Sequence, residues 1–243
     1  MRFYISPDSI SPDKNIIEIR DKQEIHHIRD VMRLKIGNKI NAFDGMASEF
    51  SGVIREMTRD SVIISIEDRK PFKYTKPFDV VIYQAVPKKN KMNFIVEKAV
   101  ELGVDAITPI ITDRTIPAIN NKACKRIERW RKIAIASSKQ CGRVRLPLIS
   151  DVMDFKAALA QAGEKDLRLL AALDKEARPL KSILRDGKPR HIAVFIGPEG
   201  DFSPGEISMA KEMGFIICSL GPLVMKSDTA AMYLLSCLWY ELQ

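Results

Sequence analysis

The sequence predicts an α/β protein of two domains, a small β-rich domain at residues 1–72 and a larger domain at residues 73–243. Three observations predict this fold class. Short strands joined by tight turns fill the first part of the chain. After Phe78, apolar β-branched runs alternate with helical segments, which is typical of a mostly parallel sheet covered on both faces. The length of 243 residues is ample for a sizeable hydrophobic core and allows two domains.

The N-terminal part predicts a small barrel or sandwich, because several short strands occur in fewer than 70 residues. One helix is expected at residues 22–32. The basic segment RKPFKYTKP, residues 69–77, contains two prolines and shows no period, so we expect a linker there. The candidate strands are NIIEI (15–19), NKINAFDG (38–45), EFSGVIREM (49–57) and SVIISIED (61–68).

The C-terminal part predicts five buried strands separated by helices. A helix at residues 92–102 ends at Gly103, and the last helix carries an apolar stripe, both of which we assign to the core. Ser203, Pro204 and Glu206 predict a capped helix start, with its end at Gly214. The candidate strands are DVVIYQAV (79–86), DAITPIIT (105–112), LRLLAAL (167–173), HIAVFIG (191–197) and FIICSLG (215–221).

Two irregular loops follow two of these strands. The first is GPEGD at residues 197–201, and the second is LGPLVMKSDT at residues 220–229. In open α/β sheets, ligands bind beyond the carboxyl ends of the strands, where glycines let the backbone approach closely. The two loops therefore predict a small-molecule pocket.

Several functional classes lose support because their motifs are absent. The sequence contains no phosphate-binding P-loop, no dinucleotide G-x-G-x-x-G, no H-E-x-x-H and no G-x-S-x-G. The four cysteines are far apart and the three histidines lack metal-ligand spacing, so neither disulfides nor a metal site are expected. No signal peptide or membrane span is apparent, and we expect a cytoplasmic protein.

Positive charge is concentrated in one segment. The net charge is +8, and residues 122–145 contain nine lysines and arginines against the single acid Glu128. Such a density favours a polyphosphate partner such as nucleic acid, although a solvated helix face would show the same pattern.

Five blocks of the sequence, in order, resemble one known family, the SPOUT-superfamily 16S rRNA (uracil-N3)-methyltransferases. IGPEGDFSPGEI resembles the family's G-P-E-G-G-F-S-x-x-E motif, and LGPLVMKSDTAAM resembles its L-G-x-x-I-L-R-x-E-T-A motif. HHIRDVMRLKIGNKI, KMNFIVEKAVELGVDAITPI and ERWRKIAIASSKQCGRVRLP resemble three further segments. Asp201 stands where the family usually has glycine, and Lys226, Ser227 and Asp228 replace its usual Arg, Thr and Glu.

The resemblance implies an N-terminal PUA-like β-barrel that binds RNA and a C-terminal α/β domain with a trefoil knot. It also implies S-adenosylmethionine as cofactor, 16S rRNA of the small ribosomal subunit as partner, and a homodimer. The cofactor residues carried over by position are Leu173, Gly197, Pro198, Glu199, Gly200, Leu220, Gly221, Leu223, Met225, Thr229 and Ala230. Glu199 could equally order its own loop.

Methylation of uracil at N3 requires a flipped or unpaired base and loss of the N3 proton. Asp228 is the candidate base, and Lys226 or Arg33 is the candidate cation that stabilises charge on the uracil oxygens. Asp228 could instead be only a first-turn helix charge. The candidate RNA contacts, each of which could also be an ordinary surface charge, are Arg29, Arg33, Lys35, Arg129, Arg143 and Arg145.

Three functions remain open on the sequence alone. The first is the uracil-N3 rRNA methyltransferase. The second is a related enzyme that acts on another RNA atom, such as a ribose 2'-hydroxyl. The third is a non-catalytic rRNA-binding assembly factor, which the two-loop block disfavours.

Overall fold

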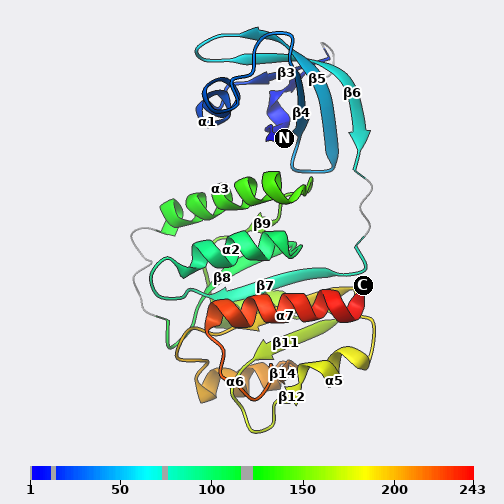
Figure 1. The fold of residues 1–243 in the computed structure, drawn as a ribbon. Coiled ribbons are helices and arrows are strands. Elements are labelled where there is room, and N and C mark those ends of the chain that lie inside the picture. The colour runs from blue at the N-terminus through cyan, green and yellow to red at the C-terminus, as the bar shows by residue number, and fades with distance from the viewer. Residues whose placement is uncertain (1, 12–14, 73–75, 116–122) are drawn as a thin grey trace. The chain divides into compact units, whose positions relative to one another are not determined.

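The computed structural model describes residues 2–11, 15–72, 76–115 and 123–243. Contacts divide the chain into two compact units (Figure 1). One comprises Met1–Tyr74 with Ile135–Leu146, and the other comprises Thr75–Ala134 with Pro147–Gln243. The expected boundary between residues 72 and 73 falls beside residues 73–75, which lie outside the described residues, as does Lys122 of the basic segment. A division of function between residues 1–72 and 73–243 remains a prediction.

The N-terminal unit is built on a six-stranded sheet in the order β1-β4-β5-β6-β3-β2. All pairs are antiparallel except β1 with β4. Alternation of apolar and polar residues predicted the four longer strands, and their inward side chains, such as Phe50, Ile54 and Ile64, form one core with Phe3. The strands are β1 (Arg2–Tyr4), β2 (Ile10–Ser11), β3 (Ile16–Ile19), β4 (Lys39–Phe43), β5 (Ser48–Met57) and β6 (Val62–Pro71).

The linker prediction for residues 69–77 is wrong at its start. Strand β6 continues to Pro71, and Arg69, Lys70 and Pro71 pair with residues of β5. A proline lacks a backbone N–H, but at the last position of a strand this costs little, because the ladder ends there. The ladder is then closed by a hydrogen bond of 2.7 Å from the Phe72 N–H to the Ala47 carbonyl.

The helix expected at residues 22–32 is composite. Helix α1 (Lys22–His26) begins at Asp21, whose carboxylate accepts the N–H groups of Gln23 and Glu24. A π-helical turn (His27–Val31) follows, and the chain leaves it through Arg33, which has a φ of 53°. Positive φ is unusual for a residue other than glycine, so this turn holds backbone strain.

Segment Ile135–Leu146 packs within the N-terminal unit, which nothing in the sequence pattern indicated. It includes the end of helix α3 (Ala123–Cys141). The Lys139 ammonium lies 2.8 Å from both carboxylate oxygens of Glu24, and these side chains are only 15% and 13% exposed. Arg2 donates to the Gly142 carbonyl at 2.5 Å. A buried ion pair therefore connects residues that are far apart in the sequence.

The C-terminal unit is an eight-stranded sheet whose strands all pair in parallel, in the order β10-β8-β7-β13-β11-β14-β12, with β9 beside β8. The five predicted strands are present. The strands are β7 (Asp79–Ala85), β8 (Ala106–Ile111), β9 (Leu148–Ile149), β10 (Met153–Asp154), β11 (Leu167–Ala171), β12 (Arg178–Pro179), β13 (His191–Ile196) and β14 (Ile216–Ser219).

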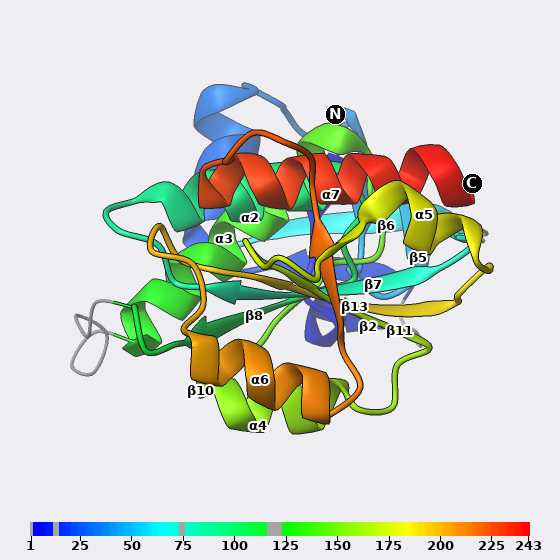
Figure 2. The same cartoon turned by 90° about the horizontal axis from the view of Figure 1, so that it is seen from below.

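Both faces of this sheet are buried, which explains the unbroken apolar runs of its central strands. Along β13, Ile192, Val194 and Ile196 face one core, whereas Ala193 and Phe195 face the other. Figure 2 shows helices on both sides of the sheet. The first face is covered by α2 (Lys91–Glu101), α5 (Leu180–Arg185) and α7 (Ser227–Leu242), and the second by α4 (Phe155–Ala162) and α6 (Pro204–Glu212).

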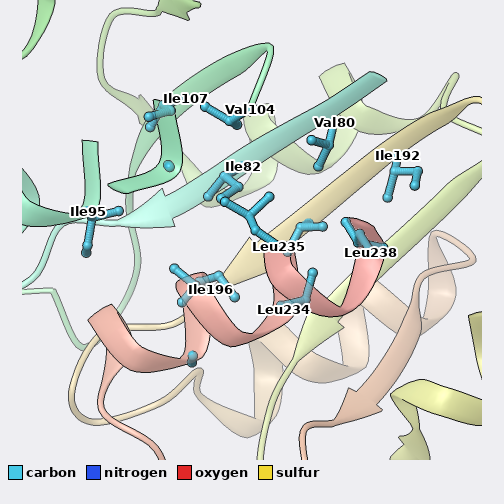
Figure 3. Packing of buried hydrophobic residues seen from close by; sticks show 14 of the residues in the cluster. Val80, Ile82, Ile95, Val104, Ile107, Ile192, Ile196, Leu234, Leu235 and Leu238 are labelled. Carbon is cyan, nitrogen blue, oxygen red and sulfur yellow. The ribbon is translucent and has the colours of Figure 1, made fainter. Parts of the chain in front are cut away.

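The predicted helix signals are confirmed. Leu234, Leu235 and Leu238 of α7 pack on β7 and β13 (Figure 3). Ser203 and Glu206 form the capping box of α6, and the Glu206 side chain also accepts the Asp113 N–H at 3.0 Å. Among the described residues, no helix has the length and apolarity needed to cross a bilayer.

Replacement of Lys139 by alanine tests whether residues 135–146 stabilise the N-terminal unit. Lys139→Ala leaves the Glu24 carboxylate mostly buried without its cation, so we expect the free energy of unfolding to fall by about 1–3 kcal/mol. Urea denaturation followed by circular dichroism measures this change. Lys132→Ala, an exposed change on the same helix, should have an effect within about 0.5 kcal/mol. Overlapping curves for Lys139→Ala and wild type would contradict the assignment.

Candidate functional site

The predicted loops meet in one pocket at the carboxyl ends of three neighbouring strands. Strand β11 pairs in parallel with both β13 and β14, so the loops that follow them emerge at the same edge of the sheet. The pocket is lined by Ala171, Ala172, Leu173, Ile196, Gly197, Pro198, Glu199, Asp201, Cys218, Ser219, Leu220, Gly221, Leu223, Val224, Met225, Ser227 and Ala230.

The rim of the pocket is apolar and open to solvent. Leu173, Leu223 and Val224 are 65%, 77% and 76% exposed, which is unusual for large apolar side chains that lie together. On the pocket wall, burial raises the pKa of the Cys218 thiol to about 12, so it stays neutral and is not a nucleophile at neutral pH. This lining suits a ligand with a flat apolar part.

Every residue predicted to bind cofactor lines this pocket except Gly200 and Thr229. Thr229 is exposed on the first turn of α7. The Gly200 carbonyl instead accepts a hydrogen bond of 2.5 Å from Arg114, which follows β8. Sequence reasoning missed eight lining residues, most of them small or apolar neighbours of the predicted ones: Ala171, Ala172, Ile196, Asp201, Cys218, Ser219, Val224 and Ser227.

A buried hydrogen-bond chain joins the two predicted loops. The Ser227 hydroxyl donates to the Gly197 carbonyl at 2.6 Å and accepts the Gln84 side-chain amide at 2.9 Å. Ser227 is 5% exposed and Gln84 is fully buried. Because buried polar groups are costly unless they are paired, these bonds fix the end of β7, the loop after β13 and the start of α7 against one another. The motif resemblance marked Ser227 as a departure but did not indicate this role.

Glu199 lines the pocket and joins its loop to the segment that follows β7. Its carboxylate accepts the Lys91 ammonium at 2.9 Å and the Lys88 N–H at 3.2 Å. Burial acts to raise the pKa of Glu199, but the hydrogen bonds from Lys91 and the backbone outweigh it, and the pKa lies below its ordinary value. Both alternatives stated for Glu199 are therefore compatible with its position.

Asp228 lies on the first turn of α7, and no described residue forms a hydrogen bond with its buried Oδ1 atom. Lys91 is close enough for the two charges to interact. The pKa of Lys91 is raised first by its hydrogen bond with Glu199, and the negative charge of Asp228 contributes further. Lys226, the predicted cation, is exposed at the N-cap of α7. Lys91, which pairs with Glu199, is thus a second cation whose charge acts on the candidate base, and sequence reasoning missed it.

Three of the candidate RNA contacts, Arg29, Arg33 and Lys35, belong to the N-terminal unit. Arg33 and Lys35 are exposed, whereas Arg29 forms two hydrogen bonds with Asp30 at 2.8 and 2.9 Å. These bonds, together with one from His26, hold the pKa of Asp30 at about 2.

The candidate RNA contacts of the basic segment also differ in exposure and hydrogen bonding. Arg129 and Arg145 are exposed, but Arg143 is partly buried and donates to the Arg145 carbonyl at 2.5 Å. Arg143 therefore shapes the local backbone, and Arg129 and Arg145 are the freer candidates for RNA contact. No group of histidine, cysteine or acidic side chains suited to a metal occurs among the described residues.

Two family models match this chain and together cover most of its length. An RNA methyltransferase domain matches residues 74–239, and an RNA methyltransferase PUA domain matches residues 19–67. The chain is 28% identical, over 90% of its length and 88% of the relative's, to ribosomal RNA small subunit methyltransferase E of Bacillus subtilis.

Two solved structures share the fold. A Legionella pneumophila methyltransferase in complex with S-adenosylmethionine has a TM-score of 0.88 and 29% identity, covering 98% of this chain and 96% of that one. The small subunit methyltransferase E of Neisseria gonorrhoeae, also bound to S-adenosylmethionine, has a TM-score of 0.86 and 25% identity, with 98% and 96% covered. The inferred fold class, an α/β methyltransferase domain preceded by a PUA-like domain, is confirmed, the trefoil knot stays a prediction, and the chain belongs to the RNA methyltransferase family.

Proposed function

We propose that this chain transfers the methyl group of S-adenosylmethionine to N3 of a uridine in the RNA of the small ribosomal subunit. The observation that carries the proposal is the pocket formed by the loops after β11, β13 and β14, in a chain of the RNA methyltransferase family. The relatives named for small-subunit RNA methylation and the neighbours bound to S-adenosylmethionine support the substrate and the cofactor.

The residues of the pocket fit this cofactor. Leu173, Leu220 and Leu223 offer apolar surface for the adenine ring, and the loop backbones offer N–H and C=O groups for its polar edge. At Gly221, with a φ of 129°, nothing lies within 4 Å of the position of a side chain, so the backbone there is open to a ligand. When bound, S-adenosylmethionine supplies an electrophilic methyl group on a positively charged sulfur.

The residues near the start of α7 fit the proton chemistry. N3 of uracil must lose its proton as the new N–C bond forms, and the Asp228 carboxylate, whose buried Oδ1 has no hydrogen-bond partner among the described residues, is the candidate acceptor, directly or through a water molecule. Lys91, which interacts with Asp228, would stabilise negative charge on the uracil oxygens, as would Lys226. Arg33 belongs to the N-terminal unit, and a role for it at the reacting base stays a prediction.

The partners follow from the same proposal. Exposed Arg33, Lys35, Arg129 and Arg145 offer positive charge to phosphates. A second copy of the chain would complete the active enzyme as a homodimer, as the resemblance implies. Because the proposed substrate is ribosomal RNA, we place the protein in the cytoplasm.

The direct test is a methylation assay with small ribosomal subunits and rRNA that lack the modification. With methyl-labelled S-adenosylmethionine, we expect incorporation of one methyl group per RNA and recovery of 3-methyluridine after digestion and mass spectrometry. Recovery of a 2'-O-methylated nucleoside would replace the proposed reaction by the related one. Stoichiometric RNA binding without cofactor binding or methyl transfer would favour an assembly factor and overturn the proposal.

The variant Asp228→Asn distinguishes the two roles considered for Asp228, a proton acceptor in the reaction and a charge that stabilises the start of α7. The change nearly preserves shape, so the cofactor dissociation constant measured by calorimetry should stay close to wild type, while single-turnover methylation should slow by roughly 100-fold. Glu241→Gln, at the other end of the same helix, should leave both quantities unchanged. Wild-type turnover in Asp228→Asn would assign Asp228 to helix stabilisation alone.

RNA affinity should depend steeply on salt, because lysines and arginines displace counterions from phosphates. The double variant with Arg129→Ala and Arg145→Ala should lower the slope of log affinity against log salt by about one for each lost phosphate contact. Filter binding over a salt series measures this slope. Arg185→Ala removes an exposed arginine that pairs with Glu241 and serves as the control. An equal slope in the double variant and the control would remove these arginines from the docking surface.

A further inference from the structure

Asp201 is held in an unusual backbone conformation on the pocket wall. Its φ is 61°, in the left-handed region that favours glycine, and its N–H closes a turn on the Pro198 carbonyl at 3.0 Å. Asparagine and aspartate tolerate this region better than other side chains, which explains how an aspartate occupies a position where the family motif has glycine.

The Asp201 carboxylate is fixed by two backbone hydrogen bonds. Oδ2 accepts the Leu173 N–H at 2.8 Å, and Oδ1 accepts the Phe202 N–H at 2.8 Å. The first bond joins the loop after β11 to the loop after β13, and both loops line the pocket. The carboxylate therefore has a defined position between two loops, and it does not move freely in solvent.

The charge of Asp201 is not neutralised by an ion pair within the described part of the chain. The other carboxylate of the pocket, Glu199, is paired with Lys91. The remaining lining side chains are apolar, hydroxyl or thiol groups, and burial keeps the Cys218 thiol neutral. Asp201 thus brings to the pocket a negative charge without an ion-pair partner among the described residues, since the nearby Arg114 guanidinium bonds with the Gly200 and Phe202 carbonyls. Charges act more strongly in a partly buried pocket than in water.

The proposed reaction changes the charge of the cofactor by one unit. The methyl group moves from sulfur to N3, the electron pair of the broken S–C bond stays on sulfur, and the N3 proton goes to the base. The positively charged sulfonium becomes the uncharged thioether of S-adenosylhomocysteine. A negative charge on the pocket wall therefore attracts the cofactor more than the product.

We propose that Asp201 is a specificity-determining residue, whose carboxylate favours the charged cofactor over the uncharged product and thereby assists their exchange. This inference rests on the proposed function. Glu199 contributes less to the preference, because Lys91 already balances its charge.

The test measures the dissociation constants of S-adenosylmethionine and S-adenosylhomocysteine by calorimetry for wild type and Asp201→Asn. Asparagine tolerates positive φ but keeps only one acceptor oxygen, so it retains one of the two backbone hydrogen bonds. Loss of the other bond weakens both ligands alike, and the ratio of the two constants therefore reports the charge. We expect the preference for S-adenosylmethionine, taken as the ratio of the two constants, to fall by about threefold to tenfold. Most of the change should come from weaker binding of S-adenosylmethionine.

Two further variants separate charge from structure. Glu176→Gln removes an exposed carboxylate from the loop after β11 that does not line the pocket, and its ratio should equal that of wild type. Asp201→Gly removes the charge and both hydrogen bonds, so both ligands should bind more weakly and the ratio should again fall.

Parallel weakening of both ligands in Asp201→Asn, at an unchanged ratio, would overturn the inference and leave Asp201 as a structural residue, without touching the proposed function. A wild-type protein that binds neither compound would overturn the proposed function together with this inference.

Discussion

The hydroxyl of Ser227 holds the site together, because its hydrogen bonds join three parts of the chain that are far apart in sequence. Gln84 is the last residue but one of strand β7, Gly197 begins the loop after β13, and Ser227 begins α7. All three residues are buried, so an unmade bond would leave a polar group buried without a partner. The two loops that line the pocket therefore depend on a partner from a third strand, and the pocket keeps its shape only while β7, β13 and α7 stay packed.

That packing is supplied by the sheet itself. Parallel strands with both faces buried have little freedom to shift, because a displacement would disturb two cores at once. The residues of β13 alternate between the two cores, and α7 covers one of them with a leucine stripe. The carboxyl ends of β11, β13 and β14 consequently lie at a fixed edge, and irregular loops beyond that edge can serve binding without contributing to the core.

Two carboxylates line the pocket, and they are held in different ways. Lys91 bonds with Glu199 on the loop after β13, and the negative charge of Asp228 also helps to raise the pKa of Lys91. Asp201 keeps its charge unpaired but holds its position through backbone N–H groups. The pocket therefore has one carboxylate in an ion pair, Glu199, and one without an ion pair among the described residues, Asp201. This combination suits S-adenosylmethionine, which would lose its positive charge in the proposed methyl transfer.

The sequence by itself determined the two-part fold class, the main strands, the capped helix α6 and the two loops of the pocket. These features depend on local periodicity, turn chemistry and capping, which short stretches of residues encode. The motif resemblance added the family and the predicted cofactor residues. All of these line the pocket except Gly200 and Thr229.

Only the tertiary structure decided the features that need partners distant in the chain. Examples are the Lys139–Glu24 ion pair, the hydrogen bonds of Ser227, the Lys91–Glu199 ion pair, and the continuation of β6 to Pro71. In each case the deciding contact joins residues from separate elements, and no local pattern records which elements meet.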